Sequence, residues 1–232
     1  MSQCSSVSRY VIAAIALVLT ASTTVSAQGE AFVPQVGQAG KDVVWVPTPP
    51  ELVERMLDLA KVTPQDFVMD LGSGDGRNVI GAAKRGAQAV GVEYNPDMVE
   101  LSKRNAEKEG VSDRATFVKA DLFESDFSRA TVITMFLLPE INLKLRPKIL
   151  KLKPGTRVVS NTFTMGEWKA DETASETPTC EASWCTALLW IVPARVAGAY
   201  DIPLGRLVLK QEFQMLSGTL TSEGKTFALQ GK

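Results

Sequence analysis

Asp70-Leu71-Gly72-Ser73-Gly74-Asp75-Gly76-Arg77 links a short apolar run to a helical pattern. Phe67-Val68-Met69, just before it, is typical of a buried parallel strand, and residues 78–85 continue as a helix. Glycines suit such a junction, because the backbone must turn sharply and a ligand can approach where no Cβ stands in the way. The helix that follows also offers free N–H groups at its start. The stretch therefore predicts a strand-to-helix turn around a nucleotide-like ligand.

Carboxylates at the ends of the next two predicted strands support the same site. The second strand ends on Glu93, 17 residues past Gly76, where a carboxylate can accept both ribose hydroxyls. The third ends at Asp121-Leu122, where a carboxylate can accept from an adenine amino group. Open parallel sheets bind ligands outside the carboxyl ends of their strands, so we expect Asp70, Glu93 and Asp121 to meet in one crevice.

Two other interpretations of these residues are weighed against that site. Asp121 alone is equally well explained as a helix cap. A dinucleotide site also places an acidic residue after the second strand, but its fingerprint is G-x-G-x-x-G/A. Here the glycines run Gly72-x-Gly74-x-Gly76, and Arg77 stands where the third small residue is needed. The spacing therefore disfavours a dinucleotide.

Six segments carry a resemblance to a known family: Val46-Pro47-Thr48-Pro49, Asp70 to Arg77, Gly91-Val92-Glu93, Leu137-Leu138-Pro139, Leu145-Arg146-Pro147 and Lys153 to Ser160. Over residues 43–168 the chain resembles the class I, seven-strand S-adenosylmethionine-dependent methyltransferases. More narrowly, it is similar to a small bacterial and mitochondrial group that includes the lysine methyltransferases of the ATP synthase c-subunit and the ADP/ATP carrier. The resemblance implies S-adenosyl-L-methionine as cofactor and a protein lysine amine as acceptor. The alternatives are a small-molecule methyltransferase and an exported, non-catalytic binding or scaffold protein that keeps the fold.

The resemblance also assigns residues to the two sides of the site. The expected cofactor contacts are Thr48, Asp70, Gly72, Gly74, Gly76, Glu93, Asp121 and Leu122. Phe136, Pro139 and Asn161 are expected to flank the acceptor. The group's pattern has Tyr where this chain has Phe136 and His-Asp where it has Asn161-Thr162. Both positions border the expected acceptor pocket.

Composition limits the chemistry and the partners. The 232-residue chain has a formal charge of −1 and no long run of Lys or Arg, so nucleic acid is not an expected partner. It contains no His, which removes the usual base at neutral pH and the usual metal ligand. Its three cysteines, at positions 4, 180 and 185, have no C-x-x-C spacing, so we expect no metal site. The oligomeric state does not follow from the sequence.

The first 27 residues have the pattern of a secretory signal peptide. Arg9 precedes an apolar core over residues 11–19, and Val25-Ser26-Ala27 forms a small-residue cleavage site. Cleavage after Ala27 predicts a periplasmic or secreted protein, although export separates it from a cofactor made in the cytosol. The alternative is an uncleaved membrane anchor, which would suit a membrane-proximal substrate. After cleavage Cys180 and Cys185 remain, either paired in the oxidising compartment or as two free thiols.

Alternating strands and helices predict an α/β fold, a doubly wound, Rossmann-like parallel sheet. The predicted strands are 67–69, 87–93, 115–120, 131–136, 157–163 and 186–192, and the predicted helices begin at Pro49-Pro50, Asn78 and Pro96, with a fourth over Ile141, Leu145 and Ile149. An entry segment, 28–47, precedes the methyltransferase domain, 48–232. Within that domain we expect a loop insertion over 166–184 and an antiparallel β extension over 186–232. The extension includes a hairpin of Arg206–Leu220 with Lys225–Leu229 around Glu223-Gly224.

Overall fold

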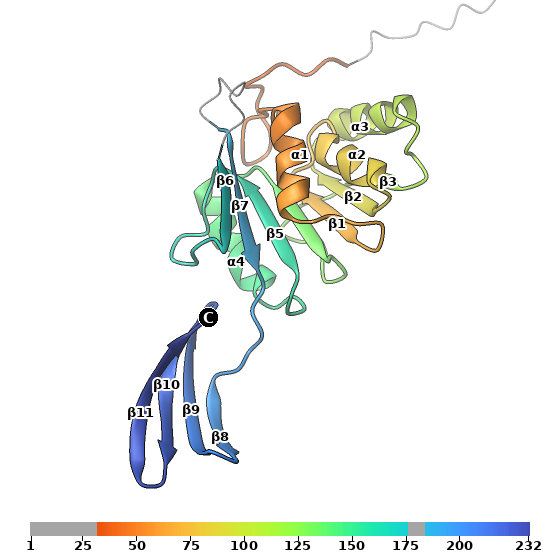
Figure 1. Ribbon diagram of the computed structural model, residues 1–232. Helices are drawn as coiled ribbons and strands as arrows, with labels where there is room; N and C mark the ends of the chain where they lie inside the picture. The colour runs from red at the N-terminus through yellow and green to blue at the C-terminus, as the bar shows by residue number, and fades with distance from the viewer. Residues whose placement is uncertain (1–31, 176–183) are drawn as a thin grey trace, which may run out of the picture. The chain divides into compact units, whose positions relative to one another are not determined.

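The computed structural model of the chain describes residues 32–175 and 184–232 (Figure 1). The predicted signal peptide, the start of the entry segment, Cys4 and Cys180 lie outside the described residues. In the part of the chain that is described, no helix is both long enough and apolar enough to cross a membrane. The described residues likewise contain no group of three or more side chains suited to a metal ion.

A seven-stranded, mostly parallel sheet forms the body of the fold, with strand order β3-β2-β1-β4-β5-β7-β6. Its strands are β1 (Phe67–Leu71), β2 (Gln88–Glu93), β3 (Ala115–Lys119), β4 (Val132–Met135), β5 (Arg157–Asn161), β6 (Glu172–Ser175) and β7 (Thr186–Ile191). Only β7 runs against its neighbours, because it pairs antiparallel with both β5 and β6. The chain order reverses between β1 and β4, so the carboxyl ends of these two strands flank a crevice.

Helices cover both faces of this sheet (Figure 1): α1 (Pro50–Leu59), α2 (Arg77–Lys84), α3 (Pro96–Lys108) and α4 (Pro139–Ile149). Strand residues alternate between two buried clusters, so that Val68 packs with the cluster of α1 to α3 and Met69 with the cluster of α4. Three of the helices begin with Pro, whose missing N–H costs nothing at that position. The predicted doubly wound α/β fold is confirmed.

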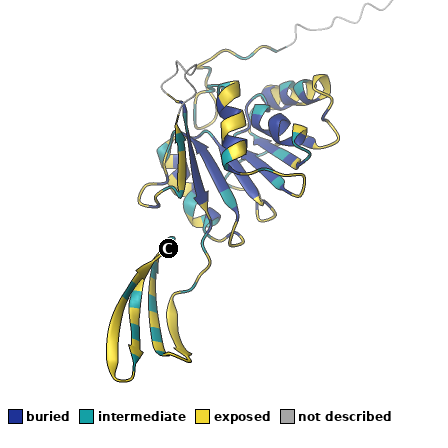
Figure 2. Ribbon diagram, in the orientation of Figure 1, coloured by how far each residue is buried: buried dark blue, intermediate teal, exposed yellow. Residues whose placement is uncertain are grey.

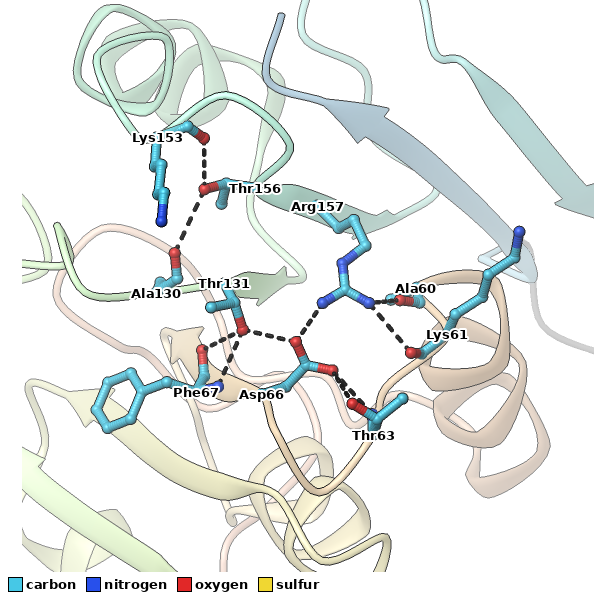
Figure 3. Close-up of polar contacts among 10 residues, drawn as sticks. All are labelled: Ala60, Lys61, Thr63, Asp66, Phe67, Ala130, Thr131, Lys153, Thr156 and Arg157. Atoms are coloured by element: carbon cyan, nitrogen blue, oxygen red, sulfur yellow. Dashed lines mark hydrogen bonds and ion pairs between the residues drawn. The ribbon is translucent and has the colours of Figure 1, made fainter.

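Polar groups tie the amino ends of the central strands to the end of α1 (Figure 3). Asp66 accepts from Thr131 Oγ1 at 2.7 Å and from the Arg157 guanidinium, which also donates to the Ala60 carbonyl at 2.6 Å. Burial raises the pKa of Asp66, but bonds from Thr131, from the Thr63 N–H and the charge of Arg157 outweigh it and leave that pKa below its ordinary value. This network lies at the edge of the sheet opposite the crevice.

The predicted loop insertion is wrong in part. Residues 172–175 form β6, an edge strand that pairs with β7. Its sequence, Glu-Thr-Ala-Ser, is polar and almost fully exposed, so it carries no alternating apolar signal. Residues 186–191, which we assigned to the β extension, belong instead to the main sheet as β7.

The C-terminal residues form a separate four-stranded antiparallel sheet in the order β11-β10-β9-β8. Its strands are β8 (Gly198–Ile202), β9 (Gly205–Glu212), β10 (Met215–Ser222) and β11 (Lys225–Gly231). The turn at Glu223-Gly224 matches the prediction. The segment predicted from Arg206 to Leu220, with its alternation interrupted at Gln211, forms two strands, because Phe213 has a left-handed φ of 52° and turns the chain between β9 and β10.

Candidate functional site

A cavity of about 220 Å³ opens at the carboxyl ends of the central strands. Its wall comes from the glycine turn after β1, the ends of β2 and β3, and the segment after β4. The fourth side is the entry segment, of which residues 38–47 all line the cavity, followed by Thr48. The predicted site residues Thr48, Asp70, Gly72 and Gly74 meet here, together with Glu93, Asp121, Leu122 and Phe136.

The glycine turn is shaped for close approach. The N–H groups of Gly72 and Ser73 both donate to the Val92 carbonyl, at 2.9 and 3.0 Å, which anchors the turn to β2. Gly72 and Gly74 have φ of 77° and 54°, a region that other residues rarely adopt. A Cβ on Gly74 would stand 2.8 Å from Trp45 Nε1. The turn therefore requires glycine both for its conformation and for the space beneath the entry segment.

Gly76 is the N-cap residue of α2. It is not among the residues that line the cavity. A Cβ there would lie 2.8 Å from the ring of Phe117 and 3.0 Å from Ser102 Cβ. The third glycine therefore allows α2 to start close against β3 and α3, and its contact with the cofactor stays a prediction.

Glu93 holds the turn and the start of α3 with its two carboxylate oxygens. Oε2 accepts from the N–H of Gly74 at 2.9 Å, and Oε1 accepts from the N–H of Asn95 at 2.8 Å. Carboxylate oxygens can each accept a second bond, so a bound diol could share them. Asn95 in turn caps α3 by accepting from the Asp97 N–H. Glu93 thus connects the glycine turn to the start of α3 and also lines the cavity.

Asp70 is a buried carboxyl group at the end of β1. Only 2% of it is exposed, and its Oδ1 accepts from Thr134 Oγ1 at 2.7 Å and from Asn78 Nδ2 at 3.1 Å. Burial raises its pKa to about 7, and nearby Glu93 adds to the rise, against the two hydrogen bonds that lower it. Asp70 therefore changes charge near neutral pH.

Lys41 of the entry segment pairs with Asp121. Its Nζ lies 2.5 Å from Asp121 Oδ2 and 5.0 Å from the ring centre of Tyr94. The bond from Lys41, together with the Phe123 N–H, lowers the pKa of Asp121. The sequence analysis missed Lys41 and Trp45 as wall residues. The adjoining motif, residues 46–49, was the one signal that this segment belongs to the site.

Three aromatic rings form the wall near β4 and β5, which we name the aromatic wall: Phe136, Phe163 and Trp184. Phe136 stacks on Phe163 with centroids 5.9 Å apart and lies 6.3 Å from Trp184. Phe163 and Trp184 lie outside the motifs that carried the resemblance, and for that reason the sequence did not single them out as a pair.

Pro139 and Asn161 do not line the cavity. Pro139 is the first residue of α4. Asn161 is fully buried, donates to Thr48 Oγ1 at 3.5 Å and accepts from Thr162 Oγ1 at 2.9 Å. Asn161 therefore reaches the cavity wall only through Thr48, and an acceptor-side role for Pro139 and Asn161 stays a prediction.

The residues present fit S-adenosylmethionine. Glu93 could hold the ribose hydroxyls. Among the described residues, the charged side chains of the wall are Lys41, Asp42, Asp70, Asp75, Arg77, Glu93 and Asp121. Their excess of carboxylates suits a cationic sulfonium donor.

Comparisons with known proteins agree with this site. Residues 70–172 match the family model described as the ANTKMT methyltransferase domain. The chain is 52% identical over 133 residues to a protein-lysine N-methyltransferase of Saccharolobus islandicus, covering 56% of this chain and 83% of the relative. It is 35% identical over 133 residues to the human lysine N-methyltransferase of the ATP synthase c-subunit, of which it spans 57%, with 57% of this chain covered.

Solved structures give the same fold. A crystal structure from Salinibacter ruber, titled an RNA methyltransferase in complex with S-adenosyl-L-homocysteine, has a TM-score of 0.61 and 46% identity and covers 65% of this chain and 96% of its own. An O-methyltransferase from Thermotoga maritima, at 16% identity and a TM-score of 0.54, covers 67% of this chain and 68% of its own and matches in fold alone. The cofactor is S-adenosyl-L-methionine, and the chain belongs to the ANTKMT methyltransferase family, with the fold of the class I methyltransferases.

Proposed function

We propose that this enzyme methylates a lysine amine of a protein. The observation that carries the proposal is the aromatic wall, which faces the cavity beside the cofactor turn with three rings and no charged group. A lysine side chain combines an apolar stem with a terminal amine, and aromatic faces attract both the stem and an ammonium. The curated relatives are named as lysine methyltransferases of proteins, which supports the same acceptor.

The chain's residues would position the acceptor rather than activate it chemically. The methyl group is already activated on the sulfonium, so the acceptor nitrogen must be neutral and in line with it. The nitrogen then forms a bond to the methyl carbon as the carbon–sulfur bond breaks, which leaves a thioether and a methylated ammonium. With no His in the chain, the amine would lose its proton to solvent before it enters the uncharged aromatic wall. The desolvation there favours the neutral amine.

Labelled methyl donor distinguishes the acceptor classes. The enzyme, incubated with cell extract and labelled S-adenosylmethionine, should transfer label to protein, and acid hydrolysis should release it as methyllysine. Phe163→Ala should lower the rate at least about 10-fold and leave cofactor affinity unchanged, because the ring lines the acceptor side. Leu143→Ala, at an exposed position on α4, is the matched control.

Other outcomes of that experiment would contradict the proposal. Label in RNA would favour the activity named for the Salinibacter ruber structure, and label in the low-molecular-weight fraction would favour a small-molecule acceptor. Cofactor binding with no transfer to any fraction would favour a non-catalytic scaffold. Each result is read from a separate fraction of one reaction.

The first 27 residues support a further proposal, that the protein is exported. Their support is the apolar core and the small-residue site at Val25-Ser26-Ala27. Cys185 is disulfide-bonded, which suits an oxidising compartment, and both of the other cysteines lie outside the described residues. Amino-terminal sequencing of the protein from its native cell should begin at Gln28. A start at Met1 in a membrane pellet would favour the anchor instead.

A further inference from the structure

The C-terminal sheet has one apolar face. Because side chains alternate along each strand, the register places one set on a common face. We name this set the apolar sheet face: Tyr200, Ile202, Leu207, Leu209, Leu216, Leu220, Phe227 and Leu229. Its other members are Gly198, Gly205, Gln211, Gly218, Ser222 and Gly231, with Lys225 as the one charged residue, beside the final turn.

In the described chain, residues 194–196 bond to the face at Gln211 and Tyr200, and the leucine side chains of the face are only half-buried. No residue from 193 to 232 is buried, and Figure 2 shows the sheet in yellow and teal without the dark blue of the main core. Phe227 is 51% exposed and Tyr200 41%. A patch of this size is unusual on a protein that acts as a monomer.

The contacts that attach the sheet leave the face open. They come from the turn between β9 and β10 and from the last residue. Phe213 stacks on Trp168 with centroids 6.0 Å apart, Gln214 donates to the Lys169 carbonyl at 2.8 Å, and Lys232 Nζ lies 2.5 Å from Asp171. None of these residues belongs to the apolar sheet face.

We propose that the apolar sheet face is covered by the same face of a second copy, so that two four-stranded sheets stack into a sandwich. The strands are 5 to 8 residues long. At about 4.8 Å between strands and about 3.3 Å per residue, each face spans about 450 Å², and a face-to-face pair about 900 Å² before side-chain relief is counted. That is close to the area of about 1,000 Å² that a specific interface needs.

The chemistry of the face favours a copy of itself over a membrane surface. A face that binds anionic lipid carries a rim of several Lys and Arg residues, whereas this one has only Lys225. A two-fold pair needs only that a patch complement itself, and an uncharged leucine-rich face does so. The charged residues of β9, Arg206, Lys210 and Glu212, lie on the opposite face and would stay in water.

Sedimentation equilibrium of the full chain at micromolar concentrations tests the proposal. The wild type should have the mass of a dimer. Leu209→Glu places a carboxylate in the centre of the sandwich and should raise the dimer dissociation constant at least about 100-fold, because each pair would bury two unpaired charges. Val208→Glu is the matched control, since it makes a similar change one residue away on the opposite face and should leave the dimer intact.

Separate results would overturn the proposal. A wild-type chain of monomer mass would do so directly, and needs no variant. A dimer that survives Leu209→Glu would place the contact elsewhere, and a monomer that floats with anionic vesicles would assign the face to a membrane. Cofactor binding by Leu209→Glu, measured alongside, reports that the main domain is folded, and far-UV circular dichroism reports the strand content.

Discussion

Glu93 shows how much of the site depends on one side chain. Its carboxylate accepts from the N–H groups of Gly74 and Asn95, so it connects the glycine turn to the start of α3 while facing the cavity. Asp70, a strand away, is buried and half-protonated near neutral pH. The two carboxylates differ in their surroundings: backbone N–H groups bind Glu93 at the cavity wall, whereas Asp70 is enclosed and bonded by the side chains of Thr134 and Asn78.

Glu93→Ala should weaken cofactor binding by about 1.5 to 3 kcal/mol, the usual contribution of hydrogen bonds to a charged group. The turn also loses a partner for the Gly74 N–H. Calorimetry with S-adenosylmethionine measures the change. Glu100→Ala, at an exposed carboxylate of α3 paired with Lys103, should bind like the wild type. Equal affinity in Glu93→Ala would refute the ribose assignment.

Asp70 predicts a pH dependence of stability. Its pKa is about 7 in the folded protein and 3.8 in the reference state, so the folded chain holds the extra proton between about pH 4 and pH 7. The free energy of unfolding should therefore fall as pH rises through this window, by about 4 kcal/mol at most. Asp66 and Asp121, whose pKa values are lowered, act in the opposite sense but only at lower pH.

Asp70→Asn should flatten that profile, since the amide keeps an oxygen for Thr134 and cannot ionise. Urea unfolding at pH 5 and at pH 8 measures the difference. The variant should be the more stable protein at pH 8 and differ little from wild type at pH 5. A wild-type stability that rises between these two pH values would contradict the assignment.

At the scale of elements, the glycine turn and the entry segment form one unit. Residues 38–48 close one side of the cavity, and Trp45 stands directly over Gly74. Lys41 reaches the end of β3 through Asp121. The segment before α1 is therefore part of the binding site and not merely a connection to it. On the opposite edge of the sheet, the Asp66 and Arg157 network ties the starts of the strands to the end of α1 (Figure 3).

Gly74→Ala should weaken cofactor binding about 10-fold or more, because the new Cβ meets Trp45 Nε1 at 2.8 Å and pushes the entry segment outward. Gly110→Ala is a matched control: it has a comparable positive φ of 69° but open space around it. Both should lose similar stability from backbone strain. Only Gly74→Ala should lose affinity in calorimetry, and equal losses would contradict the contact.

Arg157→Ala should lower the free energy of unfolding by about 3 kcal/mol, because the buried carboxylate of Asp66 loses the cation that pairs with it. Two carbonyls at the end of α1 also lose a donor. Chemical denaturation measures the loss. Lys103→Ala removes an exposed pair and should change stability little. Cofactor affinity of folded Arg157→Ala should match wild type; a large loss would connect this edge to the site.

At the scale of the molecule, the chain consists of the seven-stranded methyltransferase fold and the separate C-terminal sheet of β8 to β11. The Salinibacter ruber structure is covered over 96% of its length by 65% of this chain. The site residues all lie between positions 38 and 184, ahead of β8. Cofactor binding therefore belongs to the seven-stranded unit, and the C-terminal sheet serves another purpose, which we assign to self-association.

A chain that ends after Ala197 should bind S-adenosylmethionine within about 3-fold of wild type, because no wall residue is removed. It should be less stable, since Phe213 no longer covers the ring of Trp168. Calorimetry and thermal unfolding measure the two effects separately. Loss of binding in a chain that still unfolds cooperatively would show that the sheet shapes the site.

Local patterns in the sequence predicted most of the main sheet and several of the carboxylates and glycines that line the cavity. Strand and helix starts agree to within one or two residues for the elements from α1 to β5, because short apolar runs, Pro at helix starts and Gly at turns act through neighbours in the chain. Glu93 and Asp121 were found for the same reason, since the ends of parallel strands share an edge.

Only the tertiary structure decided the rest. β6 is recognisable through its pairing with β7, not through its polar sequence. Phe213, in the turn between β9 and β10, packs on Trp168, 45 residues earlier. The aromatic wall joins Phe136 to Trp184 across 48 residues. Burial, with the nearby charges of Glu93 and Asp75, raises the pKa of Asp70. Such features depend on contacts between residues far apart in the sequence, and a local sequence pattern does not predict those contacts.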